Sequence, residues 1–224
     1  MAQSKFAVIG LGRFGTAIAK TLAQKGAEVM AIDNDEEKVE AIKDDVSYAV
    51  TLDATDGKAL KSQNILEMDA VIVAIGENFQ DLLLTTFVLQ ELEVKRIMAR
   101  AQGSSQRRIL EKMGIREILS PEDEVGNNVA ENLINPNVLM SMQLPDDCQI
   151  VEIKAPKNTF NRTLDDIGLR QKYQVNLVTL MRQQEDGEYH ILGVPTADTV
   201  IQQDDVIVIF GKTPHLNRFI EINK

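Results

Sequence analysis

The sequence predicts an α/β fold, in which a doubly wound parallel sheet of six strands is followed by a small α+β domain. Short apolar runs alternate with amphipathic stretches up to about residue 120, as in strands that are joined by helices. A glycine-rich turn over residues 10–15 directly follows the first apolar run. Beyond about residue 148, apolar and polar residues alternate, which is typical of half-exposed antiparallel strands.

The elements of the first domain follow one another as strand and helix. Strands are expected over residues 6–9, 29–32, 48–52, 70–75, 96–99 and 117–119, and helices over residues 13–25, 35–43, 56–63, 79–92 and 104–113. The run from Ala70 to Ile75 is apolar throughout, which favours a parallel strand with helices on both faces. Gly26 and Gly114 follow two of the helices and are typical terminators.

A further helix is expected over residues 122–134, between Pro121 and Pro136. The six strands are complete before it, so it has no sheet of its own to cover. We expect its apolar side chains to pack on a second subunit instead. They are Val125, Val129, Ala130, Leu133 and Ile134.

The chain is therefore expected to divide into residues 1–136 and 137–224. Residues 137–147 are too apolar for a free linker and are interpreted as a connector. Strands are expected over residues 148–154, 175–181, 189–192 and 206–210, around one short helix over 164–172, with a hairpin turn over 185–188. A domain of this size is only marginally stable alone, so it is a candidate for pairing.

The glycine-rich turn has the spacing and the context of a Rossmann nucleotide-binding motif, with a strand before it, a helix after it and an acid at the end of the second strand. Gly10 permits a sharp turn, Gly12 leaves room for a pyrophosphate, and Gly15 lets the helix approach the strand closely. The free N–H groups at the start of the helix then face the phosphates.

Side chains near the glycines add to this prediction. Asp33 can accept hydrogen bonds from a ribose diol and disfavours a 2′-phosphate, so NADP is not an expected ligand. Arg13 places a positive charge within reach of the phosphates or of a ligand on a neighbouring subunit, although a solvated residue on the first helical turn is the alternative. The ligand contacts expected at the turn are Gly10, Gly12, Arg13, Phe14, Gly15 and Asp33.

Ligands of doubly wound sheets lie at the carboxyl ends of the strands. The residues after the third and fourth strands should therefore line the same crevice as the glycine-rich turn. They are Asp53, Ala54, Thr55, Ala74, Ile75 and Gly76. For Asp53, a cap of the following helix is an equally good explanation.

Composition and motifs argue against several classes of protein. The single cysteine cannot form an internal disulfide and the first residues lack a secretory signal, so we expect a protein of the reducing cytoplasm. No apolar run reaches the ~20 residues of a membrane span. The net charge of −10 opposes binding to nucleic acid or to an anionic lipid surface.

Motifs of common enzymes are missing. His190 and His215 have no metal-binding spacing and are interpreted as surface residues. No tyrosine is followed by a lysine four residues later, and the sequence has neither a nucleophile elbow nor a Walker lysine motif. An enzyme is therefore not expected.

At this point the residues closely resemble the RCK (KTN) domain of Trk/Ktr-type potassium-uptake regulatory subunits. The resemblance is carried by residues 6–15, Asp33, Asp53-Ala54-Thr55, residues 71–76 and Ala99-Arg100-Ala101. Residues 164–170 and 204–211 are similar to the smaller C-terminal domain of the same family.

The resemblance implies a cytoplasmic regulatory subunit at the inner face of the cell membrane, where dimers assemble into an octameric ring under a potassium channel or transporter. An adenine nucleotide, either ATP/ADP or NAD(H), would bind the first domain with Arg100 among its contacts. Its binding would change the shape of the ring and so gate the pore. The helix after Pro121 corresponds to the crossover helix of the family.

Two further ligands are implied by the resemblance alone. Glu122 matches a position that can help to hold a divalent cation near bound ATP, although a favourable acid in the first helical turn is the alternative. Arg170 and Asn176 match positions of a pocket that binds cyclic di-AMP in some members. Leu52 departs from the glycine often found before the Asp-Ala-Thr segment.

Two other functions stay open at this stage. A regulator of cation efflux can be built from the same domains. An NAD-dependent oxidoreductase would carry its substrate on the second domain and would use His190 or His215 as proton donor.

Overall fold

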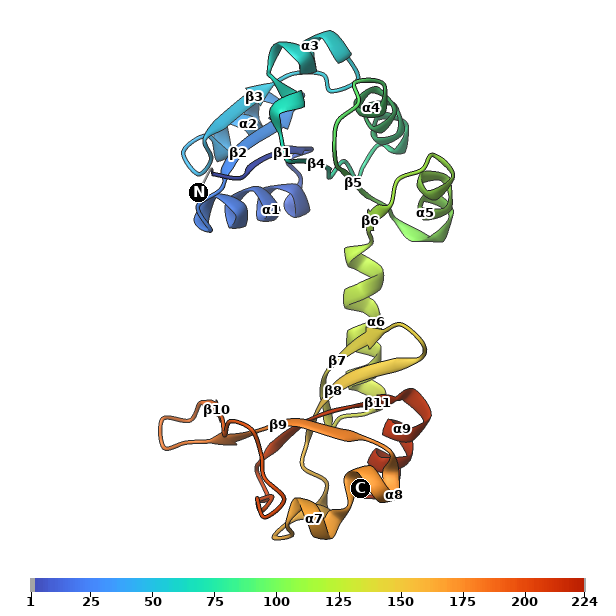
Figure 1. The fold of residues 1–224 in the computed structure, drawn as a ribbon. Helices are drawn as coiled ribbons and strands as arrows, with labels where there is room; N and C mark the ends of the chain where they lie inside the picture. The colour runs from blue at the N-terminus through green and yellow to red at the C-terminus, as the bar shows by residue number, and fades with distance from the viewer. Residues whose placement is uncertain (1–2, 224) are drawn as a thin grey trace. The chain divides into compact units, whose positions relative to one another are not determined.

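The computed structural model describes residues 3–223. The chain forms two compact units, Met1–Asp123 and Glu124–Lys224. The first unit is an open parallel sheet with the strand order β3-β2-β1-β4-β5-β6 (Figure 1). Its strands are β1 Lys5–Ile9, β2 Glu28–Asp33, β3 Tyr48–Thr51, β4 Ala70–Val73, β5 Ile97–Arg100 and β6 Glu117–Leu119. The order reverses where β1 lies beside β4, as in a doubly wound sheet.

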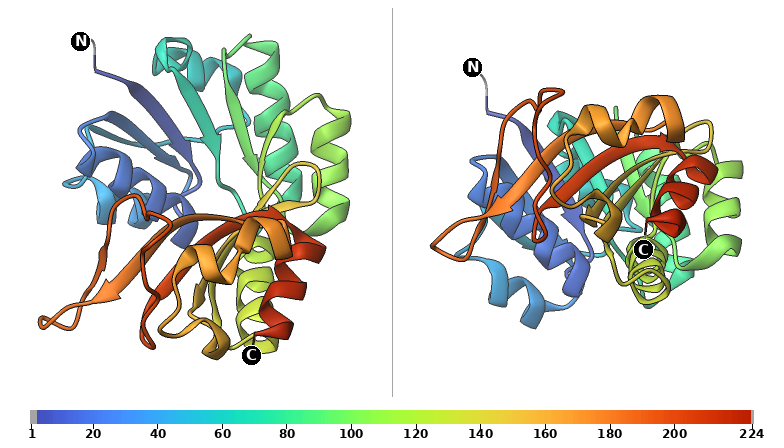
Figure 2. Two further views of the ribbon diagram at one scale, coloured as in Figure 1. Left: turned by 60° about the horizontal axis from the view of Figure 1, so that its bottom comes forward. Right: turned by 90° about the horizontal axis from the view of Figure 1, so that it is seen from below.

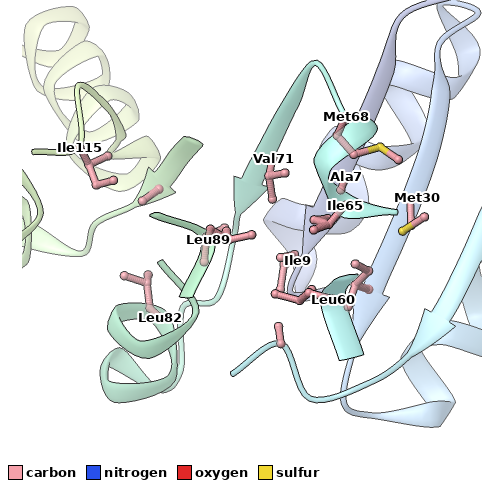
Figure 3. Packing of buried hydrophobic residues seen from close by; sticks show 14 of the residues in the cluster. Ala7, Ile9, Met30, Leu60, Ile65, Met68, Val71, Leu82, Leu89 and Ile115 are labelled. Carbon is pink, nitrogen blue, oxygen red and sulfur yellow. The ribbon is translucent and has the colours of Figure 1, made fainter. Parts of the chain in front are cut away.

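Helices cover both faces of this sheet. They are α1 Arg13–Gln24, α2 Glu36–Ile42, α3 Gly57–Ser62, η1 Ile65–Glu67, α4 Phe79–Glu91 and α5 Gly103–Lys112. Successive side chains of a strand point to opposite faces, so β1 contributes to two cores. Ile9 packs with Leu60 of α3 and Leu82 of α4 (Figure 3). Val8 belongs to the core that contains Ala19 of α1.

Polar side chains fix where three of these helices begin. Asp35, Asp56 and Asn78 each accept backbone N–H groups in the first turn of α2, α3 and α4. Among residues 3–223, no side chain caps the start of α1. The first N–H groups of α1 therefore keep their capacity to bind an anion.

Helix α6 (Pro121–Ile134) begins in the first unit and continues into the second. Its apolar residues are exposed in this single chain: Val125 by 62%, Val129 by 51%, Leu133 by 77% and Ile134 by 75%. Ala130 is exposed as well. Their packing on a second subunit, like the domain boundary at residue 136, stays a prediction.

The second unit contains a five-stranded antiparallel sheet with the order β10-β9-β11-β8-β7. Its strands are β7 Val138–Leu144, β8 Cys148–Lys154, β9 Asn176–Gln183, β10 Tyr189–Ile191 and β11 Val206–Lys212, and its helices are η2 Lys157–Thr159, α7 Leu164–Ile167, α8 Leu169–Tyr173 and α9 Thr213–Ile222. Helix α9 packs on β11 and β8 (Figure 2). There Phe219 and Leu216 are buried with Ile207 and Ile153. The hairpin expected over 185–188 is confirmed, because β9 and β10 pair antiparallel on either side of it.

The connector expected over residues 137–147 is wrong. Strand β7 lies there and pairs antiparallel with β8. The turn between them contains Asp146 and Asp147, both in the left-handed region with φ of 59° and 57°. Val138 is buried, but Met140 and Met142, which are also apolar, are exposed. Apolar residues in this strand therefore do not alternate with polar ones as they do in a half-buried strand.

The helices of the second unit also differ from the prediction in two respects. The single helix expected over 164–172 is divided by Gly168, whose φ of +66° lies outside the right-handed helical region. Helix α9 was not predicted, although its buried residues Leu216, Phe219 and Ile220 follow helical spacing.

Within residues 3–223, no helix combines the length and the apolar character needed to cross a bilayer.

Candidate functional site

The glycine-rich turn lies between β1 and α1, and two of its glycines are required by the fold itself. Gly10 has a φ of +95°, and a Cβ there would lie 2.8 Å from the backbone nitrogen of Ile75. At Gly15 a Cβ would lie only 1.9 Å from the carbonyl oxygen of Gly10. The turn is therefore packed tightly between the start of α1 and the end of β4.

Gly12 is different, because a Cβ there would meet no heavy atom within 4 Å among the described residues. Its backbone is extended, with φ of −66° and ψ of −176°, and it is the N-cap of α1. The fold of this chain does not explain why this position lacks a side chain. Gly12 also precedes the uncapped first N–H groups of α1, so the predicted phosphate contact at this position stays a prediction with which the structure is compatible.

Asp33 fixes the shape of this turn. The side chain is only 8% exposed, and its Oδ2 accepts a hydrogen bond of 2.6 Å from the N–H of Leu11. Its Oδ1 accepts a bond of 3.0 Å from the N–H of Asp35 and lies 4.0 Å from Nζ of Lys38. The sequence pattern predicted a ribose contact for this carboxylate but not its bond to the glycine-rich turn. The two carboxylate oxygens have further lone pairs, and these would accept hydrogen bonds from the hydroxyl groups of a ribose.

The residues after β3 form a turn that is separate from the cap of the next helix. Oδ1 of Asp53 accepts bonds of 2.7 Å from the hydroxyl and 2.9 Å from the N–H of Thr55. These two bonds, the hydroxyl bond first, lower the pKa of Asp53. Asp56 caps α3, so the alternative role of Asp53 as the cap of that helix is wrong.

Arg100, the last residue of β5, connects several parts of the site. Its guanidinium carbon lies 5.4 Å from the centre of the Phe14 ring, and its Nη2 forms an ion pair with Oε1 of Glu122. A Cβ at Gly76 would lie 2.5 Å from its Nη1. The Glu122 carboxylate accepts a hydrogen bond from the backbone N–H of Glu122, and this bond lowers its pKa. The hydrogen bond and the charge of Arg100 lower that pKa further. Sequence spacing alone did not predict this ion pair, whose partners are far apart in the chain.

Arg13, at the start of α1, is exposed and forms no ion pair with any residue that the structure describes. Its charge is thus available to a ligand or to another subunit, as predicted, and equally to solvent. The role of Arg13 stays a prediction.

The predicted cyclic di-AMP site at Arg170 and Asn176 and the predicted cation site at Glu122 differ in how many of their residues the structure brings together. In the second unit, Nε of Arg170 donates a bond of 2.9 Å to Oδ1 of Asn176, so these two predicted residues meet. For Glu122, no set of three His, Cys, Asp or Glu side chains in the described part of the chain is placed to hold a metal ion. A cation at Glu122 would need its other ligands from the nucleotide or from another chain.

His190 and His215 both belong to the second unit. Nε2 of His190 lies 3.1 Å from Oδ2 of Asp186, across the hairpin between β9 and β10. His215 lies in the first turn of α9.

Comparison with known proteins identifies the family. The sequence model of the TrkA-N domain matches residues 6–121, and that of the TrkA-C domain matches residues 148–224. The chain belongs to the TrkA-N/TrkA-C family. The TrkA-N match contains the parallel sheet except for Lys5, the first residue of β1, and the TrkA-C match begins at β8. Residues 122–147, with most of α6 and with β7, lie between the two matched segments.

Several named relatives resemble the chain over nearly its whole length. It is 40% identical to Ktr system potassium uptake protein C of Bacillus subtilis over 217 residues, which cover 97% of this chain and 96% of that protein. It is 37% identical to Ktr system potassium uptake protein A of the same organism over 97% of this chain and 96% of that protein. Identity to the Vibrio alginolyticus protein of the latter name is 30%, over 93% of each chain.

Solved structures share the fold. The GsuK channel superposes with a TM-score of 0.70 at 13% identity, over 99% of this chain and 40% of that chain. The GsuK channel bound to NAD superposes with a TM-score of 0.65, also at 13% identity, over 96% of this chain and 38% of that chain. The TrkA-N/TrkA-C chain thus spans less than half of the channel chain. At this identity the likeness concerns the fold alone.

Proposed function

We propose that this chain is a nucleotide-sensing regulatory subunit of a membrane potassium-uptake system. The observation that carries the proposal is the 40% identity, over 97% of the chain, to a protein named for potassium uptake by the Ktr system. The glycine-rich turn supports it, because Gly12 leaves open space before the uncapped N–H groups of α1.

The ligand is an adenine nucleotide, either ATP/ADP or NAD(H). A third GsuK structure, bound to ADP, is 29% identical to this chain over 59% of this chain and 34% of that chain, with a TM-score of 0.50. Asp33 would hold the ribose, the N–H groups after Gly12 the phosphates, and the segments at Asp53–Thr55 and Ala74–Gly76 the sides of the site. Arg13 and Arg100 would supply positive charge.

Regulation requires that the ligand bind two shapes of the assembly with different affinity. We propose that dimers of the chain, paired through the exposed apolar side chains of α6, assemble into an octameric ring. The ring would dock on the inner face of the cell membrane through the transporter. A change of its shape would then open or close the pore.

Two further ligands belong to the same proposal. A divalent cation would bind Glu122 together with the phosphates of ATP, and cyclic di-AMP would bind near Arg170 and Asn176. Their support is the match of these positions to the family and the bond that joins Arg170 to Asn176.

The proposal is tested with the purified chain and with membranes of its source. Calorimetric titration should show binding of ATP, ADP or NADH, and gel filtration should show an oligomer. The chain should also retain a potassium transporter from detergent-solubilised membranes. Failure to bind any of the three nucleotides would refute the sensor, and retention of an efflux transporter instead would change uptake to efflux. Turnover of NADH with a small carbonyl substrate would support an oxidoreductase.

A further inference from the structure

Arg100 lies between the glycine-rich turn and the start of α6. Its guanidinium carbon is 5.4 Å from the centre of the Phe14 ring, in the turn, and its Nη2 pairs with the carboxylate of Glu122, the second residue of α6. The Arg100 side chain is only 14% exposed. One largely buried cation therefore contacts both the expected ligand site and the helix that follows the sheet in the sequence.

The hydrogen-bonding capacity of Arg100 is not filled. A guanidinium has five N–H donors. The Nε of Arg100 is buried, and no acceptor among residues 3–223 bonds to it. A buried donor without a partner costs free energy, so the side chain gains from any acceptor that reaches it. Gly76 leaves the room that the guanidinium occupies, because a Cβ there would lie 2.5 Å from Nη1.

The strand order places Arg100 beyond the expected pyrophosphate. Asp33 ends β2, the glycine-rich turn follows β1, and Arg100 ends β5, in a sheet whose order is β3-β2-β1-β4-β5-β6. A nucleotide with its ribose at Asp33 and its pyrophosphate at the turn directs the rest of its length toward β4 and β5. That remainder is a terminal phosphate in ATP and a nicotinamide nucleoside in NADH. A phosphate can accept two parallel bonds from a guanidinium, and an uncharged group competes poorly with a carboxylate.

We propose that Arg100 is an exchangeable link that makes the site respond to the charge of the ligand tail. With no ligand, or with a ligand whose tail is uncharged, Arg100 pairs with Glu122. With a nucleoside triphosphate, the guanidinium turns to the terminal phosphate and releases Glu122 at the first turn of α6. The inference rests on the proposed nucleotide site and names the ligand class that operates it.

The test is calorimetric titration of ATP and NADH in buffer that contains EDTA, so that a cation at Glu122 does not contribute. Glu122→Gln should tighten ATP binding by about two- to fivefold, the value of a partly exposed ion pair that no longer competes. It should leave NADH affinity unchanged. Arg100→Gln should weaken ATP binding by about tenfold or more, since it removes hydrogen bonds to a charged group. In the double variant the gain from Glu122→Gln should vanish.

A matched control is available at the opposite end of β5. Arg96, which precedes β5, and Glu117, the first residue of β6, form a two-bond ion pair with separations of 2.7 and 2.6 Å. Glu117→Gln should change neither affinity. If Arg100→Gln does not fold, as seen by circular dichroism, Arg100→Lys replaces it in the same cycle and should keep part of the ATP affinity.

The outcomes separate this inference from the proposed function. If the unaltered chain binds neither nucleotide, the proposed function itself fails. If it binds them but Glu122→Gln weakens ATP binding, has no effect, or changes both affinities equally, the link is refuted and the function stands. Hydrogen exchange gives a second readout, in which ATP but not NADH should speed exchange in residues 124–128. Equal exchange with both ligands would also refute the link.

Discussion

The three glycines of the turn have different reasons to be glycine. Gly10 needs a positive φ and close contact with the backbone at Ile75, and Gly15 needs close contact with the carbonyl of Gly10. Gly12 has an ordinary φ and open space around it. The first two therefore serve the fold, whereas the fold sets no steric limit on a side chain at the third.

We expect Gly12→Ala and Gly15→Ala to separate binding from stability. The Cβ of Gly15→Ala would force backbone atoms apart, so the free energy of unfolding should fall by about 1–3 kcal/mol or more. The Cβ of Gly12→Ala meets no protein atom but occupies space before the helix N-terminus. Thermal denaturation should show little change for Gly12→Ala, and calorimetry should show weaker nucleotide binding. Equal loss of stability in both variants would contradict this account.

Asp205 is a buried carboxylate of the second unit. Its side chain is fully buried and accepts bonds of 2.7 and 2.8 Å from Nε and Nη2 of Arg182. It also accepts a bond of 2.7 Å from the N–H of Gln202. The carboxylate thus joins β9 to the turn that precedes β11.

We expect Asp205→Ala to destabilise the second unit by about 3–5 kcal/mol, because it removes the carboxylate that pairs with a partly buried guanidinium and the acceptor of the Gln202 N–H. Chemical denaturation followed by circular dichroism measures this change. The neighbouring Asp204 is exposed and provides the control, since Asp204→Ala should change stability by less than about 0.5 kcal/mol. Similar effects of the two substitutions would show that the ion pair contributes little.

The sequence of α6 is not explained by contacts within the described part of this chain. Four of its large apolar side chains are exposed by half or more of their surface. Such a cluster is typical of an interface between chains. The proposed pairing of two copies gives this helix a partner.

Leu133→Glu should therefore reduce the oligomeric state without unfolding either unit. Leu133 is 77% exposed, so the substitution removes little contact within the chain, but a carboxylate is costly in an apolar interface. Sedimentation velocity measures the change. Asn128→Glu is the control, because by helical spacing Asn128 lies about 140° around the helix axis from Leu133 and should leave the oligomer intact. An oligomer that survives Leu133→Glu would exclude this face as the interface.

The elements of the first unit could be predicted almost entirely, whereas those of the second unit were predicted less well. The six parallel strands are nearly continuous apolar runs, each followed by an amphipathic helix, and both patterns are local. Strand β7 was mistaken for a connector because it is an edge strand with exposed Met140 and Met142 and therefore lacks the alternation of a half-buried strand. Gly168 divided a helix by a backbone angle that spacing does not reveal.

At the scale of the whole molecule, the chain is acidic, and several of its carboxylates are held in the ionised form. Hydrogen bonds from Arg96 to Glu117, from Arg162 to Asp166 and from Thr55 to Asp53 lower the pKa of each carboxyl group. A group whose pKa is lower in the folded state stabilises that state above its unfolded pKa. The contribution is lost as pH falls through the folded pKa.

The stability of the chain should therefore change little between about pH 6 and pH 9 and should fall below about pH 4, near the ordinary pKa of carboxyl groups. Urea denaturation at a series of pH values measures this dependence, at low protein concentration because the isoelectric point is about 4.8. At pH 7, Glu117→Gln and Asp166→Asn should each lower the urea midpoint slightly. Both substitutions should also make the decrease of stability below about pH 4 less steep. A stability that rises on acidification would contradict the assignment.

The sequence by itself determined the doubly wound sheet, the glycine-rich turn and the resemblance to the family, because these depend on local periodicity and on glycine spacing. Only the tertiary structure decided that Asp33 bonds to Leu11 and that Arg100 meets both Phe14 and Glu122. It also decided that Asp56, and not Asp53, caps α3. The bonds of Asp33 and Arg100 join residues that are remote in the chain, and strand order brings their partners together. Local sequence patterns do not predict which strand ends become neighbours.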